Sequence, residues 1–388
     1  MAIHEFELKT SIQTVNIGTD TVVNAETYNG SIPGPTLELE VGDTAIVRLI
    51  NDLPHPTGIH WHGIELHNSA DGTPVTQAAV PGGVIQTLGN GVPAGGTYLY
   101  KFTVPRPGVF WYHPHHHHST NRVFKGLYGM IVVTDPAAEA PLVASGVIPG
   151  ATGTEQLVLS DITVCQAVND TVTYVDPTTI PAADRPEWLS GATAQLGPSP
   201  QALCQVSPLD EDGNPGAPFG DGEVPNMQIA APGRSVEGQT VLTNGVNVGG
   251  RSGTPANPGT LAAGAQTIDV QPGQGLRLQI ANCAILRYFR LRLTLEDGTQ
   301  VPLIRIGGEG GLLDAAIQEG GIVDGLDTRY DPGEILLPPS TRADVVAAIP
   351  AGASGVLTLW TRDFQRTGPS NPGNWAQLPT VPVLHLNV

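Results

Sequence analysis

Two pairs of histidines, each separated by one residue, are the side chains of this sequence best suited to bind a metal. His60 and His62 lie within Ile-His-Trp-His-Gly, and His113 and His115 lie within Phe-Trp-Tyr-His-Pro-His. Residues two apart in a β-strand point to the same face, so the members of each pair project together. If the two strands are neighbours, four imidazoles converge on one point.

The chemistry of imidazole narrows the choice of metal. Neutral imidazole suits copper, zinc, iron and nickel ions, and it suits magnesium and calcium poorly. Four buried imidazoles that faced one another without a metal would be expensive to desolvate. The sequence therefore predicts a transition-metal site, although strand-borne His-x-His pairs also hold catalytic zinc, which keeps a zinc hydrolase as an alternative.

Seven further histidines lie outside these pairs. His116–His118 extend the second motif into a histidine run, which we interpret as a solvated loop with incidental metal affinity. His55 and His67 flank the first motif, where surface or supporting roles are expected. His4 and His385 have no partner in the sequence and are interpreted as structural.

Strand-like patterns surround both histidine pairs. Apolar and polar residues alternate with a period of two in residues 37–49, 98–104, 276–280 and 289–295, which is typical of strands with one buried face. The chain holds 48 glycines and 35 prolines, and only 14% of its residues are charged. Many turns and few helix-stabilising charge pairs favour an all-β protein.

A shift in composition divides the chain. Residues 138–153 lie in a Pro-, Ala- and Gly-rich stretch that we interpret as a linker between domains at 1–137 and 154–388. Residues 185–225 are rich in Pro, Gly and Asp and are expected to form a loop insertion in the second domain.

A faint internal repeat supports two copies of one domain. Gly42 and Asn51 bracket a turn and a strand, and Gly273 and Asn282 do the same at a constant offset of 231 residues. A turn followed by a strand is common, so the repeat alone is weak evidence.

Net charge and hydropathy bear on whether the chain binds nucleic acid or membranes and on its cellular compartment. The formal net charge of −18 argues against nucleic acid and against anionic membranes, whose binding partners carry basic surfaces. No apolar run approaches the roughly 20 residues of a membrane span. Residues 1–8 lack the features of a signal peptide, so the chain is cytoplasmic or its signal was removed, and we favour a periplasmic or secreted location.

Three cysteines are present. Cys165 and Cys204 lie in turn-rich sequence, and we expect them to form a disulfide, which would imply an oxidising compartment. Cys283 lies in an apolar strand context and is expected to be a small buried residue.

Beyond the histidine motifs, further segments resemble the multicopper oxidase family over essentially the whole chain. In the first domain they are Asp71-Gly72-Thr73-Pro74, Thr76-Gln77 and Gly126–Val133; in the second they are Gly333–Pro339 and Arg342–Val346. Within the family, the sequence is most similar to large bacterial laccase-like or manganese-oxidase-like enzymes. The resemblance implies an all-β chain of two Greek-key β-sandwich cupredoxin domains.

The resemblance also implies the roles of individual residues. His60 would bind the type 2 copper, His62 and His113 would bind one type 3 copper, and His115 would bind the other. Asp71 matches an acidic residue thought to help deliver protons to reduced oxygen, and an ordinary Asp-Gly turn is the alternative interpretation. The implied reaction couples one-electron oxidation of a reducing substrate to reduction of O2 to water.

Part of the family's site has no counterpart in this sequence. No His-Cys-His motif occurs, so there is no type 1 copper site in this chain, and the remaining histidines of the copper cluster would come from a third cupredoxin domain. The chain is therefore expected to be an inactive half of an oxidase, completed by further sequence or by a second chain. The alternative is a free-standing copper-binding or storage protein. Phenols, manganese and cuprous ions all remain open as substrates.

Overall fold

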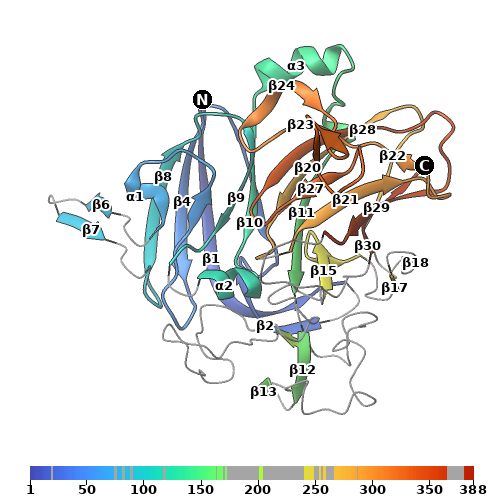
Figure 1. Cartoon of the computed structure of the whole chain (residues 1–388). Helices are drawn as coiled ribbons and strands as arrows, with labels where there is room; N and C mark the ends of the chain where they lie inside the picture. Colours follow the sequence, from blue (N-terminus) through green and yellow to red (C-terminus); the bar gives the residue numbers. More distant parts are fainter. Residues whose placement is uncertain are drawn as a thin grey trace.

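The computed structural model describes most of the two halves of the chain. The residues described are 1–18, 21–73, 77–80, 84–87, 91–116, 119–162, 164–168, 171–172, 201–203, 240–248, 253–254, 257–258, 266–285, 287–364 and 380–388. These residues form two β-sandwiches that lie side by side, the first mostly blue to teal and the second mostly yellow to red, with its strand β11 (Thr154–Ile162) in green (Figure 1). The prediction of an all-β fold is confirmed. No helix in the described part of the chain is long and apolar enough to cross a membrane.

Two sheets build the first sandwich. The larger has the order β13-β12-β14-β2-β1-β4-β8 and the smaller has the order β3-β10-β9-β5. Their strands are β1 (Ile3–Asn16), β2 (Thr21–Tyr28), β3 (Gly34–Glu40), β4 (Thr44–Asn51), β5 (His60–His62), β8 (Thr97–Thr103), β9 (Gly108–His113), β10 (Gly129–Thr134), β12 (Val164–Val168), β13 (Thr171–Val172) and β14 (Gln201–Leu203).

The second sandwich also has two sheets. One has the order β16-β15-β11-β20-β28-β23-β24, and the other has the order β19-β30-β29-β21-β22, with β27 also pairing with β21. Their strands are β11 (Thr154–Ile162), β15 (Thr240–Thr243), β16 (Val246–Asn247), β19 (Thr267–Asp269), β20 (Gly275–Asn282), β21 (Phe289–Thr294), β22 (Gln300–Val301), β23 (Ile304–Gly308), β24 (Gly311–Ile317), β27 (Ile335–Leu337), β28 (Arg342–Ala348), β29 (Val356–Arg362) and β30 (Val381–Asn387).

Short helices and hairpins complete the described residues. The helices are α1 (Asn68–Asp71), α2 (Ser119–Lys125), α3 (Pro136–Ala144) and the 3-10 turn η1 (Ala151–Gly153). The hairpins are β6 (Gln77–Val80) with β7 (Val84–Thr87), β17 (Gly253–Thr254) with β18 (Asn257–Pro258), and β25 (Ile322–Val323) with β26 (Leu326–Asp327).

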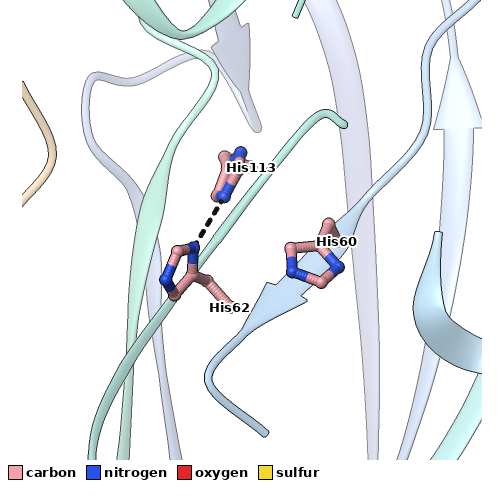
Figure 2. A group of neighbouring side chains, drawn as sticks. All are labelled: His60, His62 and His113. Atoms are coloured by element: carbon pink, nitrogen blue, oxygen red, sulfur yellow. Dashed lines mark hydrogen bonds between the residues drawn. The ribbon is translucent and has the colours of Figure 1, made fainter. Parts of the chain in front are cut away.

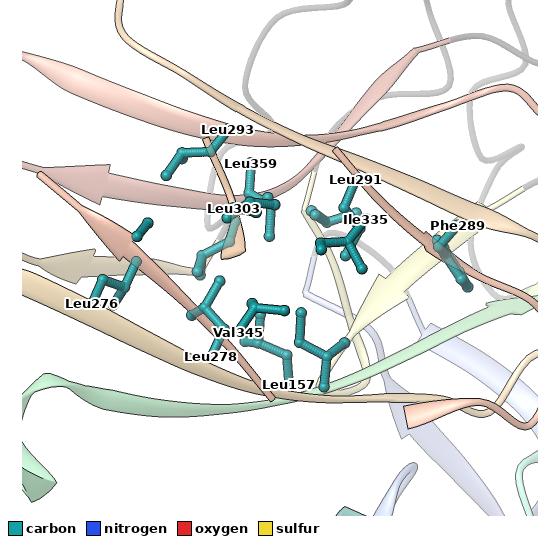
Figure 3. Packing of buried hydrophobic residues seen from close by; sticks show 14 of the residues in the cluster. Leu157, Leu276, Leu278, Phe289, Leu291, Leu293, Leu303, Ile335, Val345 and Leu359 are labelled. Atoms are coloured by element: carbon teal, nitrogen blue, oxygen red, sulfur yellow. The ribbon is translucent and has the colours of Figure 1, made fainter. Parts of the chain in front are cut away.

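Three clusters of buried side chains hold the molecule together. One fills the first sandwich and includes Trp61 and Tyr112. A second fills the second sandwich, where Leu278 and Leu359 face one another across the two sheets (Figure 3). The third lies between the sandwiches and includes Trp111 on β9. Strand β9 therefore buries one face in its own sandwich and the other against its neighbour, which fixes it from both sides.

The two sandwiches share one pairing scheme. β4 runs parallel to β1 and antiparallel to β8, and β20 runs parallel to β11 and antiparallel to β28. The smaller sheets correspond in the same way, because the parallel pair β3–β10 followed by β9 and β5 matches the parallel pair β19–β30 followed by β29 and β21. The chain thus contains two copies of one unit.

The repeated asparagines have equivalent contacts. Asn51 Oδ1 accepts a hydrogen bond from the main chain two residues later, at 3.0 Å, and its Nδ2 donates to His55 O at 2.9 Å. Asn282 Oδ1 accepts from Ala284 N at 2.9 Å, and its Nδ2 donates to Arg287 O at 2.9 Å. The side chain of each asparagine thereby forms hydrogen bonds with main-chain N–H and C=O groups of the loop that follows its strand.

The expected linker, loop insertion and disulfide can now be compared with the structure. The proposed linker 138–153 contains most of α3, which begins after Asp135 caps the main-chain N–H groups of Ala137 and Ala138. Strands β12 and β14, from the segment assigned to the second domain, extend the sheet of the first sandwich. The predicted insertion 185–225, Cys204 and the side chain of Cys165 lie outside the described residues.

Candidate metal centre

Three of the four histidines lie on adjacent antiparallel strands, and His115 follows the end of β9, so the strand expected to carry both His113 and His115 stops at His113. His60 on β5 pairs with His113 on β9, and His62 pairs with Trp111. Trp61 and Tyr112, the intervening residues, point into the core of the first sandwich. Because side chains alternate along a strand, His60, His62 and His113 share the opposite face, which is directed towards the second sandwich.

Three imidazoles meet closely enough to share a metal. One ligand nitrogen from each of His60, His62 and His113 lies within 4.8 Å of the other two. His62 Nδ1 is 3.2 Å from His113 Nε2 (Figure 2). His115 lies at the margin, with its ring centre 5.1 Å from that of His60 and 5.9 Å from that of His113. The structure therefore brings all four predicted residues into one region, with His115 the most exposed.

Main-chain carbonyl groups orient two of the rings. His60 Nδ1 donates to Asp71 O at 2.9 Å, and His113 Nδ1 donates to Pro114 O at 2.8 Å. Each bond places the proton on Nδ1 and leaves the lone pair of Nε2 directed away from the carbonyl. This support of a metal-binding histidine through its second nitrogen is the usual arrangement in metal sites.

Burial keeps the imidazoles in the neutral form that binds metals. It lowers the pKa of His62 to about 4, with the positive charge of Arg342 as the next cause. It lowers the pKa of His60 below its ordinary value despite the opposing effect of Asp71, and it holds the pKa of His113 well below that value. At neutral pH these nitrogens therefore need lose no proton to solvent before they bind a cation.

A tryptophan covers one side of the centre. The ring of Trp111 stacks on that of His113 with the centres 3.9 Å apart, and it lies 5.2 Å from that of His62. Trp111 is buried in the cluster between the two sandwiches. Its ring therefore restricts the rotation of His113 and excludes water from that side.

Asp71 stands beside His60 at the edge of the centre. Its Oδ1 is 3.5 Å from His60 Nδ1, and its Oδ2 accepts a hydrogen bond from Thr73 Oγ1 at 2.8 Å. The side chain is 31% exposed. A carboxylate that touches a ligand ring and reaches solvent is suited to orient that ring and to exchange protons with water.

The donor set fits a borderline transition-metal ion. Two nitrogens that bind one ion at about 2.0–2.1 Å lie roughly 3 Å apart, which agrees with the separation of His62 Nδ1 and His113 Nε2. Such an ion would take the place of the proton that these two atoms share, and the proton of His62 would then lie on Nε2.

A buried ionic cluster that the sequence patterns did not predict includes His55, next to the Pro56 carbonyl that His116 contacts. Glu26 Oε1 accepts from Arg122 Nη1 at 2.7 Å and Lys125 Nζ at 3.0 Å, both on α2, and lies 3.3 Å from His55 Nε2. His116 is buried and donates to the loop after His55, so its assignment to a solvated loop is wrong. His117 and His118 lie outside the described residues.

The remaining histidines are distributed over both sandwiches. His4 Nε2 lies 2.9 Å from Asp43 Oδ2, and His67 is exposed at the start of α1. His385 is buried in the second sandwich, and its Nδ1 lies 3.2 Å from Thr358 Oγ1.

The equivalent strands of the second sandwich carry arginines. Arg290 on β21 pairs with Arg362 on β29, where the first sandwich pairs His60 with His113. Trp360 occupies the place that Trp111 holds in the first sandwich. The aromatic residue is common to both copies, and the metal-binding side chains are not.

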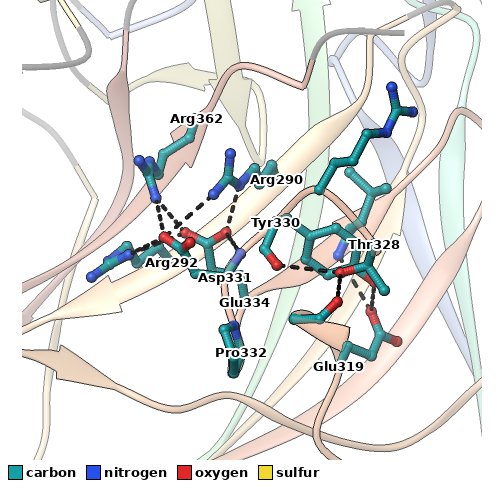
Figure 4. A network of polar contacts seen from close by, with 12 residues as sticks. Arg290, Arg292, Glu319, Thr328, Tyr330, Asp331, Pro332, Glu334 and Arg362 are labelled. Atoms are coloured by element: carbon teal, nitrogen blue, oxygen red, sulfur yellow. Dashed lines mark hydrogen bonds and ion pairs between the residues drawn. The ribbon is translucent and has the colours of Figure 1, made fainter. Parts of the chain in front are cut away.

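Carboxylates join these arginines (Figure 4). Glu334, which is fully buried, accepts from Arg290 Nε at 2.5 Å and from Arg362 Nη1 at 2.6 Å. Asp331 Oδ2 accepts from Arg292 Nη1 at 2.8 Å and from Arg362 Nη1 at 3.0 Å. An ionic cluster therefore cross-links the second sandwich at the position of the histidine centre.

Comparison with known proteins identifies relatives of this chain. A family model described as multicopper oxidase matches residues 10–138. The multicopper oxidase MmcO of Mycobacterium tuberculosis is 30% identical over 278 residues, which are 70% of this chain and 41% of that protein. The L-ascorbate oxidase of Cucurbita maxima is 41% identical over 113 residues, which are 28% of this chain and 17% of that protein. The chain thus spans less than half the length of these relatives.

Solved structures agree in fold. The McoA multicopper oxidase of Aquifex aeolicus superimposes with a TM-score of 0.61 at 21% identity, over 99% of this chain and 61% of that one. The multicopper oxidase of Campylobacter jejuni, a metallo-oxidase, gives a TM-score of 0.58 at 21% identity, over 99% of this chain and 57% of that one. The two sandwiches, the histidine pairs and these matches together show that the chain belongs to the multicopper oxidase family.

Proposed function

We propose that this chain is the two-domain, copper-binding part of an oxidase that couples one-electron oxidation of a substrate to reduction of O2 to water. The observation that carries the proposal is the meeting of His60, His62 and His113 nitrogens within 4.8 Å on adjacent strands. In this proposal His60 binds a type 2 copper, His62 and His113 bind one type 3 copper, and His115 binds the other. Copper at these positions would supply one-electron redox chemistry and a place for O2 to bind.

The chain's own residues would hold that copper in place. His60 and His113 are fixed through their Nδ1 atoms, so their Nε2 atoms are offered to the metal without rotation of the rings. Trp111 keeps water away from His113. Neutral imidazole nitrogens that are held in fixed positions and partly shielded from water bind a cation with little rearrangement of the protein.

Asp71 is proposed to handle protons. Reduction of O2 to water consumes protons, and a carboxylate that reaches both solvent and a ligand ring can pass them inwards from Oδ1. The contact with Thr73 holds the carboxylate in this orientation. Asp71→Asn would keep the main-chain contact to His60, so it should slow O2 reduction in a complete oxidase and leave copper content unchanged.

In this proposal, the electron-entry copper and the other copper ligands lie outside this chain. The type 1 copper and the other histidines would come from a third cupredoxin domain or a second chain, because the sequence contains no His-Cys-His motif. Cys283 is buried between the sandwiches, and burial raises the pKa of its thiol, which argues against a role as a copper thiolate. We further propose domains at 1–137 and 154–388, a Cys165–Cys204 disulfide and a periplasmic or secreted location.

Metal analysis of the purified chain tests the proposal. After loading with copper, the chain should retain copper without the intense visible absorption of a copper thiolate, and a His62→Ala/His113→Ala variant should retain much less. His67→Ala, which removes an exposed histidine, is the matched control. Strong blue colour in a monomeric sample, or equal copper retention by all three proteins, would contradict the proposal.

Two further results separate the alternatives. Addition of a polypeptide that contains the His-Cys-His motif should restore O2 consumption if the chain is half of an oxidase. A chain that binds copper and is never activated in this way would be a copper-binding or storage protein. Retention of zinc in preference to copper, with hydrolytic activity, would favour a zinc hydrolase.

A further inference from the structure

One residue of the second sandwich reaches the strands that carry the histidines. Arg342, the first residue of β28, has a side chain only 4% exposed. Its Nε donates to the main-chain oxygen of Val109 on β9 at 3.0 Å. Its guanidinium carbon lies 5.9 Å from the centre of the Phe110 ring, also on β9.

The contact with Val109 lies where the pairing of β5 with β9 stops. β5 ends at His62, which pairs with Trp111, so no residue of β5 pairs with β9 at Val109. Arg342 supplies a donor to the carbonyl oxygen there. A buried carbonyl without a partner would be unfavourable, so the guanidinium completes the edge of β9 directly beyond the last histidine of β5.

The same guanidinium fixes the backbone after His62. A Cβ atom at Gly63 would overlap Arg342 Nη2 and lie 3.1 Å from Phe110 Cδ1, and the φ angle of Gly63 is +90°. Only glycine adopts this conformation without strain and leaves room for the arginine. The chain therefore turns away from β9 against the face of Arg342, which sets where β5 ends.

Contacts within the second sandwich hold the guanidinium itself. Arg342 Nη1 donates to Ser340 O at 2.9 Å and lies 2.5 Å from Glu309 Oε2. The planar group thus bonds to two sandwiches at once. A lysine ammonium lacks the directed fork of donors needed to reproduce all these contacts.

We propose that Arg342 is a positioning residue for the copper ligands. It sets the end of β5, and so the place of His62, and it fixes the β9 backbone that leads to His113. The second sandwich then helps to shape the metal centre without supplying a ligand. The inference rests on the proposed function, because it concerns the histidines as copper ligands.

The test compares Arg342→Lys with Arg277→Lys. Arg277 is an equally buried arginine of the same sheet, on β20, and its guanidinium bonds to Asp344 and Glu139 rather than to β9. Arg342→Lys should weaken Cu(II) binding by about 10-fold to 100-fold and change the Cu(II) EPR spectrum. Arg277→Lys should lower the thermal midpoint and leave both copper properties as in the wild type. Equal copper affinity and spectra in all three proteins would overturn the inference.

Gly63→Ala provides a second route to the same contact. It should also weaken copper binding, and its effect should not add to that of Arg342→Gln, because both changes disturb one packing contact. Additive effects in the double variant would overturn the inference.

Hydrogen exchange in the metal-free chain separates the inference from the proposed function. Amides of β5 and β9 should exchange faster in Arg342→Lys than in Arg277→Lys, whether or not copper binds. If the wild type binds no copper and this difference is present, the copper proposal fails and the strand positioning stands. If the wild type binds copper and the difference is absent, the positioning fails alone.

Discussion

His62 Nδ1 lies 3.2 Å from His113 Nε2, although the two residues are 51 positions apart in the sequence. In the metal-free chain, one proton between these nitrogens joins the two strands. A copper ion would join them with two metal–nitrogen bonds instead, which are much stronger. The pair therefore links metal binding directly to the stability of β5 on β9.

Copper should raise the thermal midpoint of the wild-type chain. At a free copper concentration 100 times the Kd, linkage predicts stabilisation by about 2.7 kcal/mol. His62→Ala should abolish most of this shift, because it removes one of the two joined nitrogens. Scanning calorimetry with and without copper measures the effect. His67→Ala should behave as the wild type, and a full copper-dependent shift in His62→Ala would exclude the proposed ligand.

Gly72→Ala should destabilise the chain far more than Gly95→Ala. The two glycines have φ angles of 74° and 73°, so the backbone strain of the alanine is the same, about 1–2 kcal/mol. A Cβ at Gly72 would overlap Ile59 O, next to His60, whereas nothing lies within 4 Å of a Cβ at Gly95. Chemical denaturation should therefore show a much larger loss for Gly72→Ala, together with weaker copper binding. Equal losses would show that the packing beside His60 can relax.

Glu26 should make stability depend on pH in acid. Burial alone would raise the pKa of its carboxyl, but His55, Lys125 and Arg122 outweigh burial and lower it to about 2. As the pH falls, the Glu26 carboxylate therefore takes up a proton in the unfolded chain before it does so in the folded chain. The ionised carboxylate stabilises the folded chain by an amount of the order of 3 kcal/mol above about pH 4.5, and this stabilisation is lost as the pH falls towards 2. Urea titrations over this range measure the loss.

Glu26→Gln is the variant that isolates this effect. It should remove the dependence between pH 4.5 and 2 and should lower stability at neutral pH by about 3–5 kcal/mol, since two buried cations lose their anion. Asp52→Asn breaks the half-exposed pair with Lys9, which solvent screens, and should change stability far less than Glu26→Gln does. A similar small effect for both variants would contradict the assignment.

His385 should contribute in a different pH range. Burial lowers its pKa to about 4, against the opposing effect of a main-chain contact with Val248. The unfolded chain takes up this proton near pH 6.5, so stability is full above that pH and falls by up to about 3 kcal/mol as the pH drops towards 4. His385→Asn should flatten stability between pH 6.5 and 4, as followed by urea denaturation. The exposed His67→Asn should not, and an unchanged profile in His385→Asn would contradict the prediction.

The sequence was sufficient for the fold class and for the shared face of His60 and His62. Period-two alternation is a local signal, and a His-x-His pair within a strand must share a face, whereas His115 lies beyond the end of β9. The repeat of Asn51 and Asn282 also predicted two copies of one domain, because each asparagine satisfies the loop after its own strand. These local signals depend on residues close together in the chain, whereas the pairing of β5 with β9, which brings His62 to His113, joins residues 51 positions apart.

Other features depend on distant residues and could not be predicted from local patterns. Arg342 contacts Val109 across 233 positions, and nothing near either residue indicates the other. The buried state of His116 follows from its bond to Pro56, 60 positions away. Helix α3 is a different case, because Asp135 followed by Pro136 is a signal for a helix start that the linker interpretation did not use.

The arginine cluster of the second sandwich has a consequence for how the protein depends on its surroundings. Arg290 and Arg362 are joined by carboxylates that the chain always carries, whereas His60 and His113 at the matching strand positions offer only donors. The ionic cluster of the second sandwich is complete without any ion from solution. If the first sandwich binds copper as proposed, a lack of copper would lower the stability of the first sandwich and leave that of the second unchanged.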